Sequence, residues 1–224
     1  MQTYRPTIDK VESLASNGYQ MRTALYIKQA TDLIKSNFGL FASFSLVYFA
    51  FLLLVYRLGE TGSMINLFVA GPISAGFYLM VHRISIGNDY NFENFFDGFR
   101  IYLPVLVASM AANLFISLGA LLYIIPGLIA ATFLLFVMPL VVFGKLELMN
   151  ALKYSVLLVY KEALEISKFV LLIALFNIAG ALLFGIGLLF TIPFSFAAIY
   201  FAYIDIVGNE QEAEIPKNDF SHFR

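Results

Sequence analysis

The chain contains no cysteine and no tryptophan, and only two of its 224 residues are histidine. Without cysteine it can form no disulfide, no thiolate metal site and no cysteine nucleophile. The two histidines, His82 and His222, are too few for a multi-histidine iron or zinc centre. We therefore expect no metal and no cofactor. Any interfacial aromatic belt has to use tyrosine and phenylalanine.

Charged side chains are also scarce, at 13% of the residues, whereas apolar residues reach 60% and mean hydropathy is +0.82. A soluble globular domain has about 25% charged residues, so the balance excludes a soluble enzyme domain and a disordered chain. The formal net charge of −1 provides no basic excess to attract a phosphate backbone, and we expect no nucleic-acid partner. The composition predicts an integral membrane protein whose constant partner is the lipid bilayer.

Uncharged stretches provide the length for the predicted membrane spans. They cover residues 36–56, 61–81, 101–144 and 169–204. A spanning helix needs about 20 residues, so there is room for six spans. The two longer stretches have to fold back on themselves because they contain Ile125-Pro126-Gly127 and the glycines at 180, 185 and 187, and such residues favour turns and helix starts.

The sequence thus predicts an all-α fold, a polytopic membrane helix bundle with six transmembrane helices arranged as three hairpins. Helices are expected because a segment in lipid has to satisfy its own backbone hydrogen bonds. The expected spans cover residues 37–57, 63–83, 101–122, 126–144, 168–185 and 188–205. Because the last two are short, a re-entrant or tilted final hairpin is the alternative there. Residues 21–208 form one membrane domain between a cytoplasmic N-terminal segment, 1–20, and a polar cytoplasmic tail, 209–224.

Three amphipathic segments are expected to lie at the membrane surface on the cytoplasmic side, over residues 21–36, 91–100 and 146–166. In the first, apolar residues recur at helical spacing while Lys28 and Lys35 lie on another face. The second carries a stripe of four phenylalanines opposite Glu93 and Asp97. Interfacial anchoring, or packing beneath the bundle, accounts for these patterns. Recognition of anionic lipid is the alternative, and the near balance of positive and negative residues argues against strong recognition.

The distribution of positive residues predicts the orientation. With six spans, every lysine and arginine except Arg57 falls on the side of the two termini. Arg83, Arg100 and Asp205 lie at the ends of spans on that same side. The positive-inside rule then predicts that both termini are cytoplasmic.

Few polar residues lie inside the expected spans. No ionisable side chain falls in the middle of any span, which argues against an ion- or proton-coupled transporter. Asn113 and Asn177 are the most costly mid-span residues, and they either bond across helices or line a substrate path. Four prolines are expected to start or kink helices. They are Pro72, Pro126, Pro139 and Pro193.

Several short motifs together resemble a known group of membrane proteins. They are Lys35-Ser36-Asn37-Phe38-Gly39, Gly71-Pro72, Phe95-Phe96-Asp97-Gly98-Phe99, Ile125-Pro126-Gly127 and Ala151-Leu152-Lys153-Tyr154-Ser155. With them, residues 21–208 resemble the YciC-like bacterial six-helix membrane proteins and are similar to the membrane domain attached to some glycerophosphodiester phosphodiesterases. The resemblance implies an architecture and a bacterial inner membrane rather than an activity.

The sequence offers little for catalysis. It contains no HExxH, P-loop or GxGxxG motif, and no serine–histidine pair at one membrane depth. Asp89, Glu93 and Asp97, which share one loop, are the last candidates for an intramembrane enzyme. We therefore predict a non-catalytic accessory or scaffold subunit, or a local modulator of the bilayer. The alternative is a facilitator or carrier for a lipid or a small neutral lipophilic solute. Another membrane protein or a second copy of the chain would be the partner.

Overall fold

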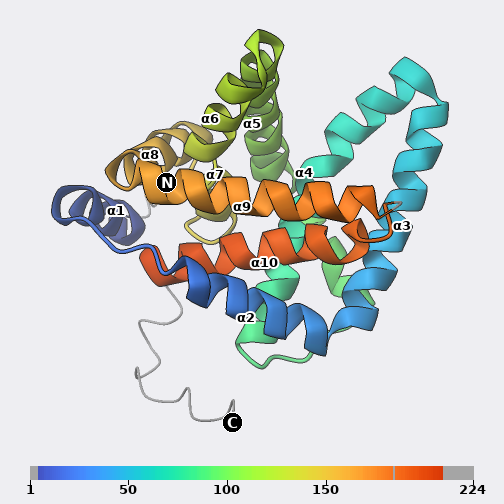
Figure 1. Cartoon of the computed structure of the whole chain (residues 1–224), viewed down its shortest axis with the longest axis horizontal. Coiled ribbons are helices and arrows are strands. Elements are labelled where there is room, and N and C mark those ends of the chain that lie inside the picture. The colour runs from blue at the N-terminus through green and yellow to red at the C-terminus, as the bar shows by residue number, and fades with distance from the viewer. Residues whose placement is uncertain (1–4, 184, 209–224) are drawn as a thin grey trace.

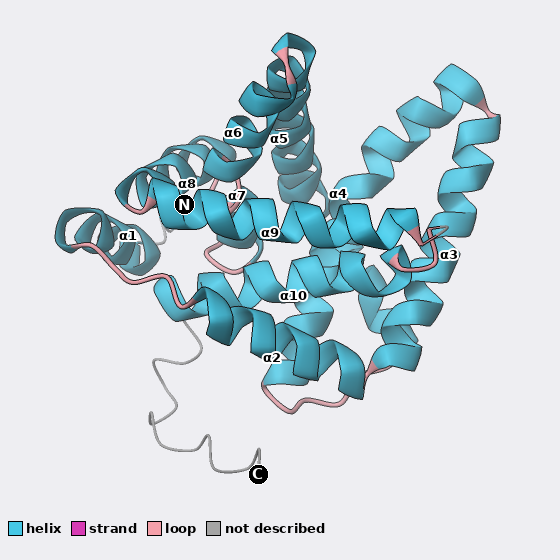
Figure 2. Cartoon of the chain, in the orientation of Figure 1, coloured by secondary structure: helices cyan, strands magenta, loops and turns pink. Residues whose placement is uncertain are grey.

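A computed structural model describes residues 5–183 and 185–208 of the chain (Figure 1). Within these ranges the fold is helical without strands, and Figure 2 shows short connections between the helices. Six of the helical stretches described are long and apolar enough to cross a membrane. The prediction of an all-α polytopic membrane bundle is confirmed, and the protein is an integral multi-pass membrane protein.

Three helical hairpins carry the apolar stretches. The first joins α3 to α4, the second joins α5 to α6 and the short α7, and the third joins α9 to α10. Their bounds are α3 Phe38–Arg57, α4 Gly59–Ser85, α5 Tyr102–Leu122, α6 Ile124–Phe133, α7 Val137–Val142, α9 Ala163–Leu182 and α10 Leu188–Ile206. The fifth expected span therefore begins before residue 168, because α9 already starts at Ala163.

Four further helices lie beside the hairpins: α1 (Arg5–Asn17), α2 (Thr23–Ser36), the 3₁₀ helix η1 (Phe92–Ile101) and α8 (Leu148–Lys161). Helix α1, which packs on α8, was not predicted from the sequence. The Tyr154 hydroxyl donates a hydrogen bond to Glu12 Oε1 at 2.8 Å. Lys161 Nζ donates to the Ser16 carbonyl at 3.2 Å. These two contacts attach the N-terminal helix to the membrane domain.

The buried core lies at one end of the hairpins. We call this end, formed by the start of α3, the end of α4, the start of α5 and the second half of α10, the base. Phe41, Phe77 and Val105 are buried there, whereas the hairpin tips expose apolar side chains such as Leu54 and Leu121. The first two hairpins diverge toward their tips (Figure 1). Packing within the chain is therefore concentrated at the base, and the tips are left for lipid.

Each hairpin is closed near its tip by a glycine. A Cβ on Gly62 would lie 1.8 Å from a backbone oxygen of α3. A Cβ on Gly119 would lie 2.8 Å from the Pro126 carbonyl oxygen, and one on Gly187 would lie 2.6 Å from Gly180 Cα. Small residues allow helix backbones to approach closely in membranes. Each hairpin is thus held together independently of its neighbours.

The fourth expected span, residues 126–144, is not one continuous helix, because α6 ends at Phe133 and α7 begins at Val137. Pro139 has no N–H to bond the carbonyl one turn earlier, which weakens the helix at this place. Ser155 of α8 fills the break. Its Oγ donates to the Phe133 carbonyl at 2.8 Å and accepts from the Phe136 N–H at 3.2 Å. The broken backbone is therefore satisfied away from lipid, as the bilayer requires.

Of the two expectations for residues 91–100, packing beneath the bundle is the one that the structure shows for one face of η1. Phe95 is fully buried and stacks on Phe44 with ring centroids 4.0 Å apart. Two glycines allow η1 to come this close to α4. A Cβ on Gly76 would lie 1.8 Å from the Phe95 carbonyl oxygen, and a Cβ on Gly98 would lie 2.0 Å from the Pro72 carbonyl oxygen. The segment consequently packs into the bundle as a 3₁₀ helix.

Candidate functional site

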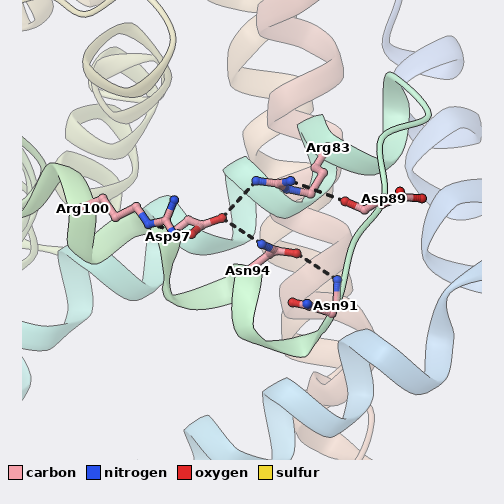
Figure 3. A network of polar contacts seen from close by, with 6 residues as sticks. All are labelled: Arg83, Asp89, Asn91, Asn94, Asp97 and Arg100. Atoms are coloured by element: carbon pink, nitrogen blue, oxygen red, sulfur yellow. Dashed lines mark hydrogen bonds and ion pairs between the residues drawn. The ribbon is translucent and has the colours of Figure 1, made fainter.

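A polar network joins the last turn of α4 to η1 at the base (Figure 3). The carboxylate of Asp97 lies between two guanidinium groups. Arg83 Nη2 donates to Asp97 Oδ2 at 3.2 Å, and Arg100 Nε pairs with Asp97 Oδ1 at 3.1 Å. The structure thus brings together Arg83 and Arg100, which the sequence predicted as separate interfacial charges.

Two asparagines hold Asp97 in place. Asn94 Nδ2 donates to Asp97 Oδ2 at 3.1 Å, and the Asn91 backbone N–H donates to Asn94 Oδ1 at 2.9 Å. This second bond also caps the first turn of η1, since the first N–H groups of a helix lack partners inside it. The start of η1 therefore orients the carboxylate that in turn orients both arginines.

The charge of the network is unbalanced. Two guanidiniums share one carboxylate, and Asp97 is only 13% exposed while Arg100 is 81% exposed. Each guanidinium has five N–H donors. Within the part of the chain that the structure describes, the contacts of Arg100 use one of them. Arg83 Nη1 also donates to the Asp89 carbonyl oxygen at 3.4 Å, while the Asp89 side chain is exposed. Arg83, Asp97 and Arg100 thus carry one net positive charge among them, and several N–H donors of Arg100 remain available to an anion.

Two adjoining pockets open beside this network. The first has a volume of about 340 Å³, and the second about 480 Å³. Ile101 and Val142 line both pockets. The first is lined further by Leu79, His82, Arg83, Ile86, Asn88, Asp97 and Arg100, and the second by Leu103, Pro104, Val107, Val141, Lys145, Leu146, Glu147 and Leu148. The pocket beside the arginines therefore adjoins a second, more apolar one.

A second polar contact ties α2 to α10. Asp205 accepts hydrogen bonds from Arg22 Nε at 2.9 Å and from the Tyr26 hydroxyl at 2.5 Å. Lys28 and Lys35 are exposed on α2. Of the predicted interfacial charges, Asp205 is therefore bonded within the fold, and the two lysines face outward.

Asn113 and Asn177 do not form a pair. Asn177 Nδ2 donates to Ser195 Oγ of α10 at 2.7 Å and to the Ile173 carbonyl at 3.0 Å. Asn113 is exposed on α5, and no hydrogen bond to it is found among the residues that the structure describes. Asn177 thus links the helices of the third hairpin, whereas Asn113 faces outward.

The four prolines occupy two kinds of place. Pro72 and Pro193 lie inside α4 and α10, where both are buried. Pro126 and Pro139 lie in the first turns of α6 and α7, where a missing N–H costs least.

One contact between α4 and α10 was not predicted from the sequence. The Tyr200 hydroxyl lies 2.8 Å from His82 Nδ1 and 2.8 Å from Ser85 Oγ. Tyr200 is one of 13 tyrosines, and nothing in its local sequence distinguishes it. The contact depends on the crossing of two distant helices.

The three acids that share a loop are not gathered into one group. Asp97 is held by the two arginines, while Asp89 and Glu93 are exposed. Over residues 5–183 and 185–208, no cluster of three histidine, aspartate or glutamate side chains is positioned to hold a metal ion. Compared with known proteins, the chain matches no protein-family model, no curated protein and no solved structure.

Proposed function

We propose that the protein is a non-catalytic subunit of a bacterial inner membrane that modulates the bilayer locally, with both termini in the cytoplasm. In this proposal it occupies more of the cytoplasmic leaflet than of the opposite leaflet. The resemblance of residues 21–208 to YciC-like proteins supports the bacterial location. The observation that carries the proposal is the position of α10 across the base.

The position of α10 follows from contacts at its two ends. Near its start, Phe190 packs against Phe38, the first residue of α3, with ring centroids 6.5 Å apart. Ten residues later, Tyr200 contacts His82 in the last turn of α4. Phe38 and His82 mark the base end of the first hairpin. A helix running parallel to this hairpin would bring its start near the tip, at Arg57, instead of back to Phe38.

The neighbouring helix α2 supports the same position. It packs along α10, with Arg22 and Tyr26 at Asp205 near one end and the Phe38–Phe190 contact just beyond the other. The exposed Lys28 and Lys35 of α2 cannot face hydrocarbon without a large cost. Because α2 has to stay at the interface, α10 beside it stays at the same level, and the third hairpin remains in one leaflet.

In this arrangement the protein has a larger cross-section in the cytoplasmic leaflet than in the opposite leaflet. The cytoplasmic side would contain α2, η1 and the third hairpin, whereas the opposite side would contain only the tips of the first two hairpins. Amphipathic and wedge-like insertions into one leaflet bind in a curvature-sensitive manner. A non-catalytic effect on local bilayer shape is therefore what the geometry supports best.

The absence of cysteine makes the topology directly testable. Single cysteines at Leu58, Tyr123 and Ile186 place one thiol at each hairpin tip, where all three side chains are exposed. We expect a membrane-impermeant maleimide to label L58C and Y123C from the side opposite to K28C. We expect I186C to stay unlabelled from that side. Labelling of I186C equal to that of Y123C would overturn the proposed position of the third hairpin.

The functional effect is measured by reconstitution. We expect the protein to concentrate in small, highly curved vesicles over large ones, and to move no solute across their membranes. Uniform partition between vesicle sizes would contradict the bilayer proposal. Solute flux by the purified protein alone would exclude a non-catalytic accessory role.

A carrier for a lipid or a small neutral lipophile is the second candidate. The adjoining polar and apolar pockets at the base favour it, because together they match an amphipathic molecule. Transfer of a labelled lipid between vesicles, dependent on the protein, would support this candidate. Lipid bound without any transfer would leave the subunit proposal in place.

A further inference from the structure

We infer that the base holds a binding site for an anionic phospholipid, with the headgroup phosphate at Arg83 and Arg100 and an acyl chain in the adjoining apolar pocket. This inference goes beyond the proposed function, because neither pocket depends on how the third hairpin lies in the bilayer. It rests on the chemistry of the two pockets and on their continuity.

The polar pocket has the groups that a phosphate requires. Arginine presents a planar fork of donors that matches phosphate oxygens. Arg83 and Arg100 both line this pocket, and Asp97 neutralises only one of their two charges. Because Asp97 is itself held by Asn94 at 3.1 Å, the guanidiniums are positioned before any ligand arrives. Such preorganisation lowers the entropic cost of binding.

The apolar pocket has the dimensions and lining that an acyl chain requires. It lies between the start of α5 and the α7–α8 connection, and its volume of about 480 Å³ is within the usual range for ligand pockets. Its apolar walls come from Leu103, Pro104, Val107, Val141, Val142, Leu146 and Leu148. Lys145 and Glu147 are its charged lining residues, and their formal charges cancel. The pocket therefore favours hydrocarbon.

The location selects a lipid over a free phosphate. Arg83 follows the uncharged residues 61–81, and Arg100 directly precedes the uncharged residues 101–144. Both arginines are thus placed where headgroups meet hydrocarbon. Basic pockets between membrane helices on the cytoplasmic side are suited to anionic headgroups. Ile101 and Val142, which line both pockets, would lie beside the glycerol backbone.

The structure also explains why the sequence argued against lipid recognition. Counted along the chain, residues 91–100 carry one positive and two negative side chains, and no amphipathic segment has a large excess of positive residues. Folding brings Arg83 of α4 to Arg100 of η1 and leaves Glu93 and Asp89 exposed outside the pocket lining. The side chains that line the pocket therefore carry a net positive charge, although residues 91–100 carry a net negative one.

Native mass spectrometry of the delipidated full-length protein tests the site. The protein is titrated with phosphatidylglycerol and with phosphatidylcholine of the same acyl chains. We expect the wild type to bind phosphatidylglycerol preferentially, and R83Q/R100Q to bind it about tenfold more weakly, since charge-assisted hydrogen bonds to phosphate are strong. The matched control K28Q/K35Q removes two exposed positive charges elsewhere and should retain wild-type binding.

A second pair of variants tests the apolar pocket. Val107→Trp fills the pocket, whereas Leu114→Trp enlarges an exposed side chain of the same helix outside it. We expect the first to reduce phosphatidylglycerol binding several-fold and the second to leave it unchanged. If R83Q/R100Q lowers the melting temperature, the exposed single variant R100Q and Val107→Trp decide the question instead.

Three results would overturn the inference. The first is equal binding of the two lipids by the wild type. The second is wild-type affinity for phosphatidylglycerol in R83Q/R100Q. The third is displacement of the lipid by glycerol phosphate at equal concentration, which would assign the arginines to a soluble phosphate instead. If displacement requires the intact phospholipid, the lipid assignment holds.

Discussion

Gly76 of α4 lies against the carbonyl oxygen of Phe95 so closely that a Cβ on the glycine would be 1.8 Å from that oxygen. This contact holds η1 in the bundle, where the Phe95 ring stacks on Phe44. It also sets the position of Asp97, two residues further along η1, and through Asp97 the positions of both arginines.

Replacement of Gly76 by alanine is expected to displace η1. Because real Cβ atoms do not come so near a backbone oxygen, the helices have to separate, and overpacking of this kind costs about 1–3 kcal/mol or more. We expect a lower melting temperature in detergent, measured by circular dichroism. Gly39→Ala is the control, because a Cβ at Gly39 meets nothing within 4 Å. Alanine there should be neutral or slightly stabilising, and an equal loss in both variants would contradict the prediction.

The two asparagines should differ in their effect on stability. Asn177→Leu removes the interhelical bond to Ser195, so we expect a loss of about 0.6–2 kcal/mol in the free energy of unfolding. Asn113→Leu changes an exposed side chain and should be neutral or stabilising. Unfolding of each variant in mild detergent provides the measurement. Loss of lipid transfer in both variants, with stability unchanged, would instead favour the carrier.

Replacement of Ser155 by alanine should lower the stability more than the same replacement of Ser109, which is also buried. Ser155→Ala leaves the Phe136 N–H and the Phe133 carbonyl without their side-chain partner at the break between α6 and α7. Unsatisfied buried groups cost about 1–3 kcal/mol. Ser109 donates to the Leu106 carbonyl of its own helix, so Ser109→Ala should change little. Equal melting temperatures for the two variants would show that the break needs no partner from α8.

Alkaline pH should weaken the contact between Tyr19 and α8. Burial, followed by the negative charge of Glu162, raises the pKa of Tyr19 above its ordinary value of 10.0. The folded protein then keeps the phenol proton when the unfolded chain has lost it. This stabilisation is present in full below about pH 10 and is lost as the pH rises further. We expect the melting temperature of the wild type to fall more steeply above pH 10 than that of Tyr19→Phe.

At neutral pH, Tyr19→Phe should be the less stable protein. It lacks the hydrogen bond from the Tyr19 hydroxyl to the Leu158 carbonyl at 2.8 Å, which is worth about 1 kcal/mol. The melting temperatures of the wild type and of Tyr19→Phe should therefore approach each other as the pH rises above 10. A constant difference between the two melting temperatures at every pH would contradict the raised pKa of Tyr19.

The hairpin helices could be predicted from the sequence, but the way in which the break between α6 and α7 is stabilised could not. Uncharged length predicts α3, α5 and α10 to within a few residues, because hydrocarbon tolerates only long apolar helices. A helix start or kink at Pro139 was predicted, and α7 begins two residues before it. The partner of the break was not predicted, since Pro139 alone does not say which distant side chain will satisfy the freed backbone. Ser155 provides that partner from α8, and a tertiary partner of this kind leaves no local signal.

The candidate site shows the same limit. Arg83, Arg100 and Asp205 were identified as interfacial charges, because each lies at the end of an apolar stretch. The grouping of Arg83 and Arg100 around Asp97 was not predicted, because the stripe of phenylalanines favoured a surface helix. Gly98, within that stripe, was the available signal. A glycine at the same spacing as the phenylalanines interrupts the apolar face where the backbone of α4 approaches.

The contact between α10 and α2 joins the last described helix to one of the first. A ribosome delivers Arg22 long before Asp205, so the earlier hairpins enter the membrane while the surface that α10 will cover is still open. Each of them is closed by a glycine near its own tip and packs there without the other hairpins. The base is completed only when the final hairpin arrives, so a chain that lacks α10 leaves exposed the surface that α10 covers in the folded protein.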